Sequence, residues 1–207
     1  MIETLLFIRH AETDLAGRFC GHSDPPVNGR GLRQIEELIE TLRTESIGAM
    51  SIDAVYSSAL SRSLTTADAI GKAFGLSPIK VPELREIGFG EWEGLSWQEI
   101  ESRDQVYARR WLEAYPDLPA PGGELFEAFQ SRVLSGVKHL LAMTSERCAA
   151  VVTHAGVMRV VLSSLCGLEE QEAWERTKVY CGFFRYQPSP TLRITVEETY
   201  TFGGKNL

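Results

Sequence analysis

Short, mostly apolar runs alternate along this chain with longer amphipathic stretches. Runs of strand length lie at residues 4–8, 53–57 and 149–153. Each is followed by apolar residues that recur every three or four positions, which predicts helices near 32–42, 61–74 and 157–165. Strands that alternate with helices indicate a three-layer α/β/α fold with a mostly parallel central sheet.

The remaining segments fit a single domain that spans residues 1–207. An extended piece is predicted at 79–81, a long helix at 124–143 and a late β-hairpin from 183–186 and 192–196. Residues 88–121 are the least regular stretch, with three of the four tryptophans and a predicted helix near 96–111. We therefore expect a lid-like insertion at about 88–123.

Composition excludes several classes of function. The net charge of −7 argues against nucleic-acid binding. No apolar run approaches the ~20 residues of a membrane span, and residues 1–8 lack the pattern of a signal peptide. The four cysteines form no C-x-x-C pair, and the four histidines lack zinc-like spacing. We expect a cytoplasmic protein with reduced thiols, no bound metal and no membrane partner.

The predicted strand ends gather residues suited to one kind of chemistry. In an open parallel sheet, ligands bind beyond the carboxyl ends of the strands. Arg9 and His10 follow the first strand, Arg62 comes soon after the second, and His154 follows the strand at 149–153. Glu86 comes shortly after the extended piece.

This set is typical of phosphoryl transfer. Arginine offers a phosphate two parallel donors. A neutral imidazole can attack phosphorus and divide one difficult step into two. A second histidine can stabilise charge on the phosphoryl oxygens, and a carboxylic acid can protonate the leaving oxygen. Because two arginines and two histidines can neutralise the phosphate, no metal or other cofactor is required.

Five segments in order also resemble one family. Residues 7–13 (FIRHAET) resemble the R-H-G-E-T signature of the histidine phosphatase superfamily, the phosphoglycerate-mutase-like group. Residues 58–63 are similar to its S-x-L-x-R-A segment, and 84–94 to its L-x-E-x-x-x-G-x-W-E-G segment. Residues 121–124 and 152–159 resemble its P-x-G-E and V-T-H-x-G-x-x-R segments. Five motifs in the right order are far more specific than any one.

The resemblance implies a phosphoglycerate-mutase-like fold and a role for each matched residue. His10 would be the phosphorylated nucleophile, Glu86 the proton donor, and His154 a member of the phosphate pocket. The implied phosphate-binding set is Arg9, Thr13, Cys20, Gly21, Arg62 and Ala155. The partner would be a small phosphorylated metabolite.

Two positions depart from the family pattern. Ala11 stands where the family has glycine, and Ala16 where it often has a phosphate-binding asparagine. The loop between Thr13 and Gly21 is also about two residues shorter than is usual in the family. This short loop and the stretch 21–27 (GHSDPPV) resemble the α-ribazole phosphatases of cobalamin biosynthesis. That resemblance implies α-ribazole 5′-phosphate as substrate.

Other interpretations stay open. A broad-specificity sugar-phosphate phosphatase, a phosphoglycerate mutase, or a phosphate-binding scaffold without turnover would share most of these residues. Glu83, Glu91 and Glu93 compete with Glu86 as the acid. Cys20 is interpreted as a small loop residue rather than a nucleophile, and His22 as either structural or a substrate contact. Three tryptophans either pack in the core or lid or stack on the substrate: Trp92, Trp97 and Trp111.

Overall fold

The computed structural model describes residues 3–44, 52–143, 147–188 and 196–200. Its centre is a sheet in the order β3-β2-β4-β1-β5-β6. The strands are β1 (Thr4–Arg9), β2 (Ala54–Ser57), β3 (Ile79–Lys80), β4 (Cys148–Thr153), β5 (Phe183–Tyr186) and β6 (Val196–Tyr200). The first four strands run parallel, and β5 pairs antiparallel with both β1 and β6. The predicted mostly parallel sheet is confirmed.

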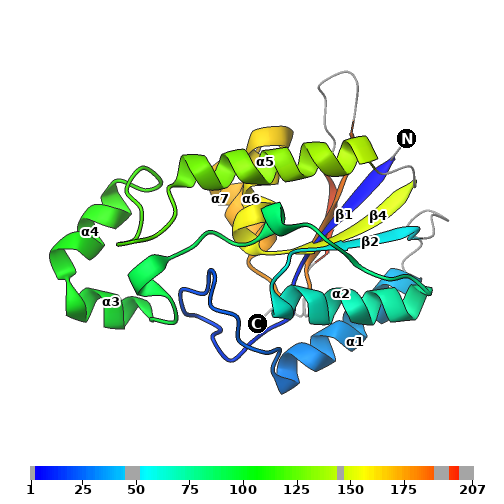
Figure 1. Cartoon of the computed structure of the whole chain (residues 1–207), viewed down its shortest axis with the longest axis horizontal. Helices are drawn as coiled ribbons and strands as arrows, with labels where there is room; N and C mark the ends of the chain where they lie inside the picture. Colours follow the sequence, from blue (N-terminus) through cyan, green and yellow to red (C-terminus); the bar gives the residue numbers. More distant parts are fainter. Residues whose placement is uncertain (1–2, 45–51, 144–146, 189–195, 201–207) are drawn as a thin grey trace.

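Helices cover both faces of the sheet (Figure 1). One face carries α1 (Gly29–Thr44) and α2 (Ser61–Phe74), and the other carries α5 (Phe126–Met143), α6 (Ala155–Cys166) and α7 (Glu170–Thr177). Alternating side chains of β1 divide between the two layers. Leu6 and Ile8 pack with residues of α1 and α2, whereas Leu5 and Phe7 pack with residues of α5 and α6. The three-layer prediction is therefore confirmed.

A small lobe, residues 89–120, lies beside this three-layer body (Figure 1). It contains the 3-10 turn η2 (Gly90–Trp92) and the helices α3 (Trp97–Arg103) and α4 (Gln105–Glu113). Another 3-10 turn, η1 (Pro82–Leu84), precedes it. The lobe has its own apolar cluster, formed by Trp92, Ile100, Ala108 and Ala120.

Several local predictions need correction. The single helix predicted near 96–111 is wrong, because the helix is interrupted at Asp104. The dihedral angles of Asp104 are not helical (φ −152°, ψ 87°), and its side chain accepts a hydrogen bond from the Tyr107 amide at 2.9 Å. Leu32 and Leu125 begin the apolar patterns that predict the helices near 32–42 and 124–143, but both side chains are exposed and do not face the core. Helix α7 has no counterpart in the sequence prediction. Of the predicted strand at 192–196, only residue 196 lies within the described residues, where β6 begins.

Asn28 ends the first loop, directly before α1. Its side-chain oxygen accepts a hydrogen bond from the Gly31 amide at 2.8 Å, so it caps α1. Within the described ranges, no helix is long and apolar enough to cross a bilayer.

Candidate active site

The carboxyl ends of β1, β4 and β2 meet at one edge of the sheet. The amide of His10 donates to the Thr153 carbonyl at 2.9 Å, and the amide of Ser58 donates to the Val152 carbonyl at 2.9 Å. These bonds continue the strand ladders and bring three loops together. The rings of His10 and His154 therefore lie with their centroids 5.0 Å apart, at 61°.

His10 is held in one tautomer. Its Nδ1 lies 2.7 Å from the carbonyl oxygen of Ala11, which can only accept, so Nδ1 carries the proton. Nε2 then keeps its lone pair and accepts a hydrogen bond from Nε of Arg62 at 3.2 Å. Burial, followed by the charges of Arg62 and Arg9, holds the pKa of His10 well below its ordinary value. The ring is neutral, as a nucleophile must be.

Arg62 is fully buried at the start of α2. Besides its bond to His10, Nη1 donates to the Ser23 carbonyl at 2.7 Å, and Nη2 donates to the carbonyls of Cys20 and Gly21 at 3.3 and 2.8 Å. Nη1 also lies 3.6 Å from a carboxylate oxygen of Asp24. The guanidinium thus joins the predicted nucleophile to the loop at residues 20–24.

The two ring nitrogens of His154 differ in their surroundings. Its Nε2 lies 2.8 Å from Oγ of Ser58 and 3.3 Å from Oγ of Ser63. Its Nδ1 is buried and has no hydrogen-bond partner among the described residues. Burial, followed by the neighbouring His10 and Arg62, keeps the pKa of His154 well below its ordinary value.

Arg9 contacts the end of α7 and the ring of Tyr180. Its Nη1 donates to the carbonyls of Thr177, at 3.2 Å, and Lys178 at the end of α7. Its guanidinium lies 3.9 Å above the ring of Tyr180. Its Nε is buried and has no partner in the described part of the chain. Burial lowers the pKa of Arg9, but a guanidinium stays protonated.

Tyr180 was not predicted from the sequence. Its ring lies 5.7 Å from that of His10, and the next residue, Cys181, donates its amide to the Arg9 carbonyl at 3.1 Å. Cys181 adopts the left-handed backbone conformation, with φ of 56°. The antiparallel pairing of β5 with β1 brings this segment to the site, and no motif marks it in the sequence.

The side chain of Glu86 contacts the first turn of α6, which begins directly after His154. Its Oε2 accepts the Gly156 amide at 3.0 Å, and its Oε1 accepts the Ile87 amide at 3.0 Å. Each carboxylate oxygen has a second lone pair that remains available for a proton. Of the competing carboxylates, Glu91 is exposed and Glu93 is engaged with the loop at 20–24.

Hydrogen bonds from Thr153 and Arg132 fix the loop that carries Glu86. Oγ1 of Thr153 donates to the Leu84 carbonyl at 2.8 Å. Arg132 of α5 donates to the carbonyls of Glu83, Arg85 and Glu86 at 2.6–2.8 Å, and binds both oxygens of Glu124 at 2.7 Å. Sequence reasoning missed Arg132, although the P-x-G-E segment contains its carboxylate partner.

The other predicted phosphate-binding residues differ in burial and in the hydrogen bonds that they make. Thr13 is buried, and its backbone forms an isolated bridge with Val27. The Gly21 amide donates to Glu93 at 3.1 Å, and the Cys20 thiol donates to the Ser23 carbonyl at 3.6 Å. Ala155 is the first residue of α6, directly after His154. Burial raises the pKa of Cys20, so the thiol is not an activated nucleophile.

The two departures from the family motifs are accommodated. Ala11 is fully buried in the apolar cluster shared with α1 and α2, so its methyl group packs in the core. Its amide donates to Oγ1 of Thr66 at 3.1 Å. Ala16 is exposed in a turn, where its amide donates to the Thr13 carbonyl at 3.1 Å.

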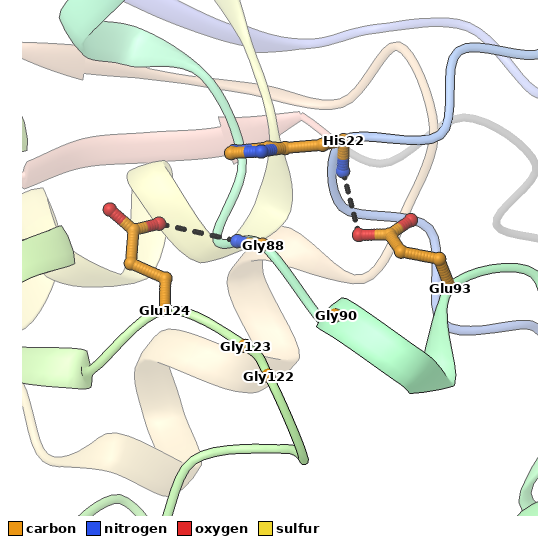
Figure 2. A pocket seen from close by; sticks show the side chains of 7 residues that line it. All are labelled: His22, Gly88, Gly90, Glu93, Gly122, Gly123 and Glu124. Carbon is orange, nitrogen blue, oxygen red and sulfur yellow. Dashed lines mark hydrogen bonds between the residues drawn. The ribbon is translucent and has the colours of Figure 1, made fainter.

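A cavity of about 440 Å³ lies next to the Glu86 loop. Figure 2 shows the His22 ring on one side and the backbone of four glycines on the other. Nε2 of His22 donates to the Glu86 carbonyl at 3.1 Å. The lining residues are His22, Gly88, Gly90, Glu93, Gly122, Gly123 and Glu124.

The three tryptophans of the small lobe pack on one another and on Phe19. Trp92 is buried, and its ring lies 5.2 Å from that of Trp111 and 6.5 Å from that of Trp97. These contacts correspond to the packing interpretation. Within the described ranges, no group of three or more His, Cys, Asp or Glu side chains has a metal-binding arrangement.

Comparison with known proteins finds similarity to one family model and to several phosphatases. Residues 5–190 match the model of the histidine phosphatase superfamily (branch 1). The chain is 30% identical over 172 residues to phosphoserine phosphatase 1 of Hydrogenobacter thermophilus, a match that covers 82% of this chain and 79% of that protein. It is 29% identical to the adenosylcobalamin/alpha-ribazole phosphatase of Escherichia coli K12, covering 82% of each. The crystal structure of the alpha-ribazole phosphatase from Shigella flexneri superposes with a TM-score of 0.82 at 25% identity, covering 98% of this chain and all of that one.

Proposed function

The chain belongs to branch 1 of the histidine phosphatase superfamily and is a phosphatase, and from that premise we propose a mechanism and a substrate class. It hydrolyses small phosphomonoesters through a phosphohistidine at His10, without a metal ion. The positive charge that the phosphate needs comes from Arg9 and Arg62, with hydrogen bonding from His154.

One observation carries this proposal. Nε of Arg9 and Nδ1 of His154 are buried and unpaired among the described residues. An unpaired buried polar atom costs about 1–3 kcal/mol, and a functional site is one of the places where such a cost persists. Both atoms belong to residues that neighbour the neutral ring of His10. Oxygens of a bound phosphoryl group would satisfy both.

In the first step, Nε2 of His10 attacks phosphorus and forms a P–N bond. The bond to the leaving oxygen breaks, and that oxygen takes a proton from the Glu86 carboxylic acid. Before attack, the Nε2 lone pair accepts the N–H of Arg62. Once that lone pair forms the P–N bond, it no longer accepts a hydrogen bond, and the Arg62 N–H donates to a phosphoryl oxygen instead. Arg62 thus moves its hydrogen bond from nucleophile to phosphoryl group by a small displacement.

In the second step, a water molecule attacks the phosphohistidine. The Glu86 carboxylate removes a proton from that water, the P–N bond breaks, and its electron pair returns to Nε2 of His10. Inorganic phosphate leaves and Glu86 is protonated again. The bond from Nδ1 of His10 to the Ala11 carbonyl keeps the ring oriented through both steps.

Two substrates are the first candidates. We propose α-ribazole 5′-phosphate, supported by the relatives in Escherichia coli and Shigella flexneri and by the short loop after His10. Phosphoserine is the second, supported by the relative in Hydrogenobacter thermophilus. The small lobe is proposed as the lid over the leaving group, because Phe19 of the loop after His10 packs in its aromatic cluster.

Phosphate release without added metal tests the proposal. The panel is p-nitrophenyl phosphate, α-ribazole 5′-phosphate, phosphoserine, 3-phosphoglycerate and fructose 2,6-bisphosphate. Each is given to the wild type, to His10→Ala and to His139→Ala, which changes an exposed histidine of α5 as the matched control. We expect turnover that is lost only in His10→Ala, and a ³²P label on the wild-type protein that is acid-labile.

The preferred substrate distinguishes the alternatives. A strong preference for α-ribazole phosphate supports the first assignment, and a preference for phosphoserine supports the second. Similar weak rates on every ester indicate a broad-specificity phosphatase, whereas transfer from 3-phosphoglycerate to 2-phosphoglycerate indicates a mutase. Phosphate binding without turnover would overturn the proposed mechanism in favour of a scaffold.

A further inference from the structure

Glu93 of the small lobe binds the loop that follows His10. Its Oε2 accepts the amides of Gly21 and Ser23 at 3.1 and 2.9 Å. Its Oε1 accepts the amides of His22 and Phe89 at 2.8 and 2.9 Å; Figure 2 shows the bond from His22. Although burial opposes it, this set of backbone bonds lowers the pKa of Glu93, so the residue is a carboxylate.

The same loop binds Arg62 through its carbonyl groups. The guanidinium of Arg62 donates to the carbonyls of Cys20, Gly21 and Ser23, while the carboxylate of Glu93 accepts from the amides of Gly21, His22 and Ser23. One short segment is therefore held between an anion and a cation. The cation in turn contacts Nε2 of His10 at 3.2 Å.

We propose that Glu93 is a positioning residue for the nucleophile, acting through the loop at 20–24 and Arg62 on His10. The inference rests on the proposed function of His10 as the nucleophile. The carboxylate fixes the orientation of three consecutive peptide groups, and their carbonyls fix the guanidinium. Arg62 then donates its N–H to the attacking nitrogen, and the same N–H can donate to a phosphoryl oxygen once the P–N bond has formed.

The loop has a second attachment that is independent of Glu93. The Phe19 amide donates to the Leu95 carbonyl at 2.8 Å, and the Gly94 amide donates to the Phe19 carbonyl at 2.7 Å. The Phe19 ring also packs within 5.0–5.8 Å of Phe89, Trp92 and Trp111. A change at Glu93 should therefore alter the pose of residues 21–23 without releasing the whole loop.

The test is Glu93→Gln, with Glu91→Gln as the matched control. The side-chain amide of glutamine offers one acceptor atom and one NH₂ group, so two of the four backbone N–H groups would face donors. Glu91 is exposed in η2, the 3-10 turn that Glu93 directly follows, and its change leaves the network intact. We expect kcat on p-nitrophenyl phosphate to fall by about 10- to 100-fold in Glu93→Gln with a small change in KM, and no change in Glu91→Gln.

The pH dependence separates positioning from a direct effect of charge. The groups that face His10 are Arg62 of α2, Arg9 of β1, His154 after β4 and Tyr180 before β5. After burial, Arg62 contributes most to lowering the pKa of His10. If Arg62 loses its pose, the acid limb of kcat/KM should move to higher pH. Loss of the negative charge on Glu93 would by itself move that limb to lower pH.

The His10 titration followed by NMR gives the same readout without turnover. A rise in the pKa of His10 in Glu93→Gln, absent in Glu91→Gln, supports the inference even if no ester in the panel is hydrolysed. A wild type without His10-dependent activity would contradict only the proposed function. Unchanged kcat and an unchanged His10 titration in folded Glu93→Gln would overturn the inference, even with a lower melting temperature.

Glu93→Asp provides the test if the glutamine variant does not fold. Aspartate keeps both oxygens but is shorter by one methylene, so the loop would have to move to reach them. We expect a smaller loss of kcat and a shift of the His10 titration in the same direction. An unchanged titration in Glu93→Asp would equally overturn the inference.

Discussion

The amide of Gly156 donates to Oε2 of Glu86 at 3.0 Å, and a Cβ atom at position 156 would lie 2.2 Å from Oε1 of the same carboxylate. The proposed acid and the first turn of α6 are in direct contact. The glycine two residues after His154 is therefore required by the position of Glu86. Any side chain there would displace the carboxylate or the helix.

Gly156→Ala should reduce kcat by on the order of 100-fold, because the displaced carboxyl no longer reaches the leaving oxygen. KM should change little, since the phosphate ligands remain. The matched control is Gly29→Ala, at the start of α1, where a Cβ meets no atom within 4 Å. Steady-state kinetics on p-nitrophenyl phosphate measure both. Wild-type kcat in Gly156→Ala would contradict the assignment of Glu86 as the acid.

Tyr180→Ala should weaken phosphate binding, because Arg9 loses the ring that lies 3.9 Å beneath its guanidinium. A cation–π contact of this kind contributes about 0.5–2 kcal/mol. We expect the inhibition constant for inorganic phosphate to rise by about 2- to 30-fold. Tyr180→Phe retains the ring and should retain the wild-type constant. Equal weakening in both variants would instead implicate the hydroxyl group.

Arg132→Lys should lower both stability and kcat. Lysine cannot reproduce the paired bonds to Glu124 together with those to the carbonyls of Glu83, Arg85 and Glu86. Because lysine leaves some of these carbonyls without a donor, we expect a loss of about 1–3 kcal/mol in the free energy of unfolding, measured by urea denaturation. Arg103→Lys, at an exposed position of α3, is the control and should behave as the wild type.

Ala11→Gly tests the departure from the family motif. The Ala11 methyl group is fully buried against α1 and α2, so its loss should destabilise the fold by about 1 kcal/mol. Because the methyl group packs in the core, kcat and KM should stay near their wild-type values. A large gain in activity in Ala11→Gly would show instead that the alanine hinders the site.

Stability should fall as the pH drops below about 6.5. Burial holds the pKa values of His10 and His154 well below the ordinary 6.5, so the unfolded chain binds protons that the folded chain does not. This contribution to stability is present above pH 6.5 and is lost as the pH falls. Each residue should give a slope of up to about 1.4 kcal/mol per pH unit.

Urea denaturation between pH 5 and 8 measures this slope. That range lies above the ordinary carboxyl value of 4.5, from which the pKa values of Glu93 and Glu124 are lowered further. His10→Asn should remove about half of the slope, and the exposed-site control His139→Asn should leave it intact. An equal slope in wild type and His10→Asn would contradict a neutral, buried His10.

Much of this architecture could be predicted from local pattern. The apolar runs before His10 and His154 fix both residues to the ends of strands, and Asn28 marks the start of α1. Such features depend on neighbours a few residues apart, which periodicity and capping preferences report directly. The break at Asp104 shows the limit of this approach, because the apolar spacing continues across it while the Asp104 side chain caps a new helix.

The sequence by itself determined the α/β order, and it predicted the two histidines, the two arginines and Glu86 as site residues. Only the tertiary structure decided what supports them. Arg9 reaches a carbonyl 168 residues away because β5 adds antiparallel to β1 and brings the end of α7 to the site. The bonds from Arg132 to the Glu86 loop, and those from residues 21–23 to Glu93, likewise join segments that are 46 to 72 residues apart. Such contacts follow from how layers pack, and packing leaves no periodic trace in the sequence around the residues that it joins.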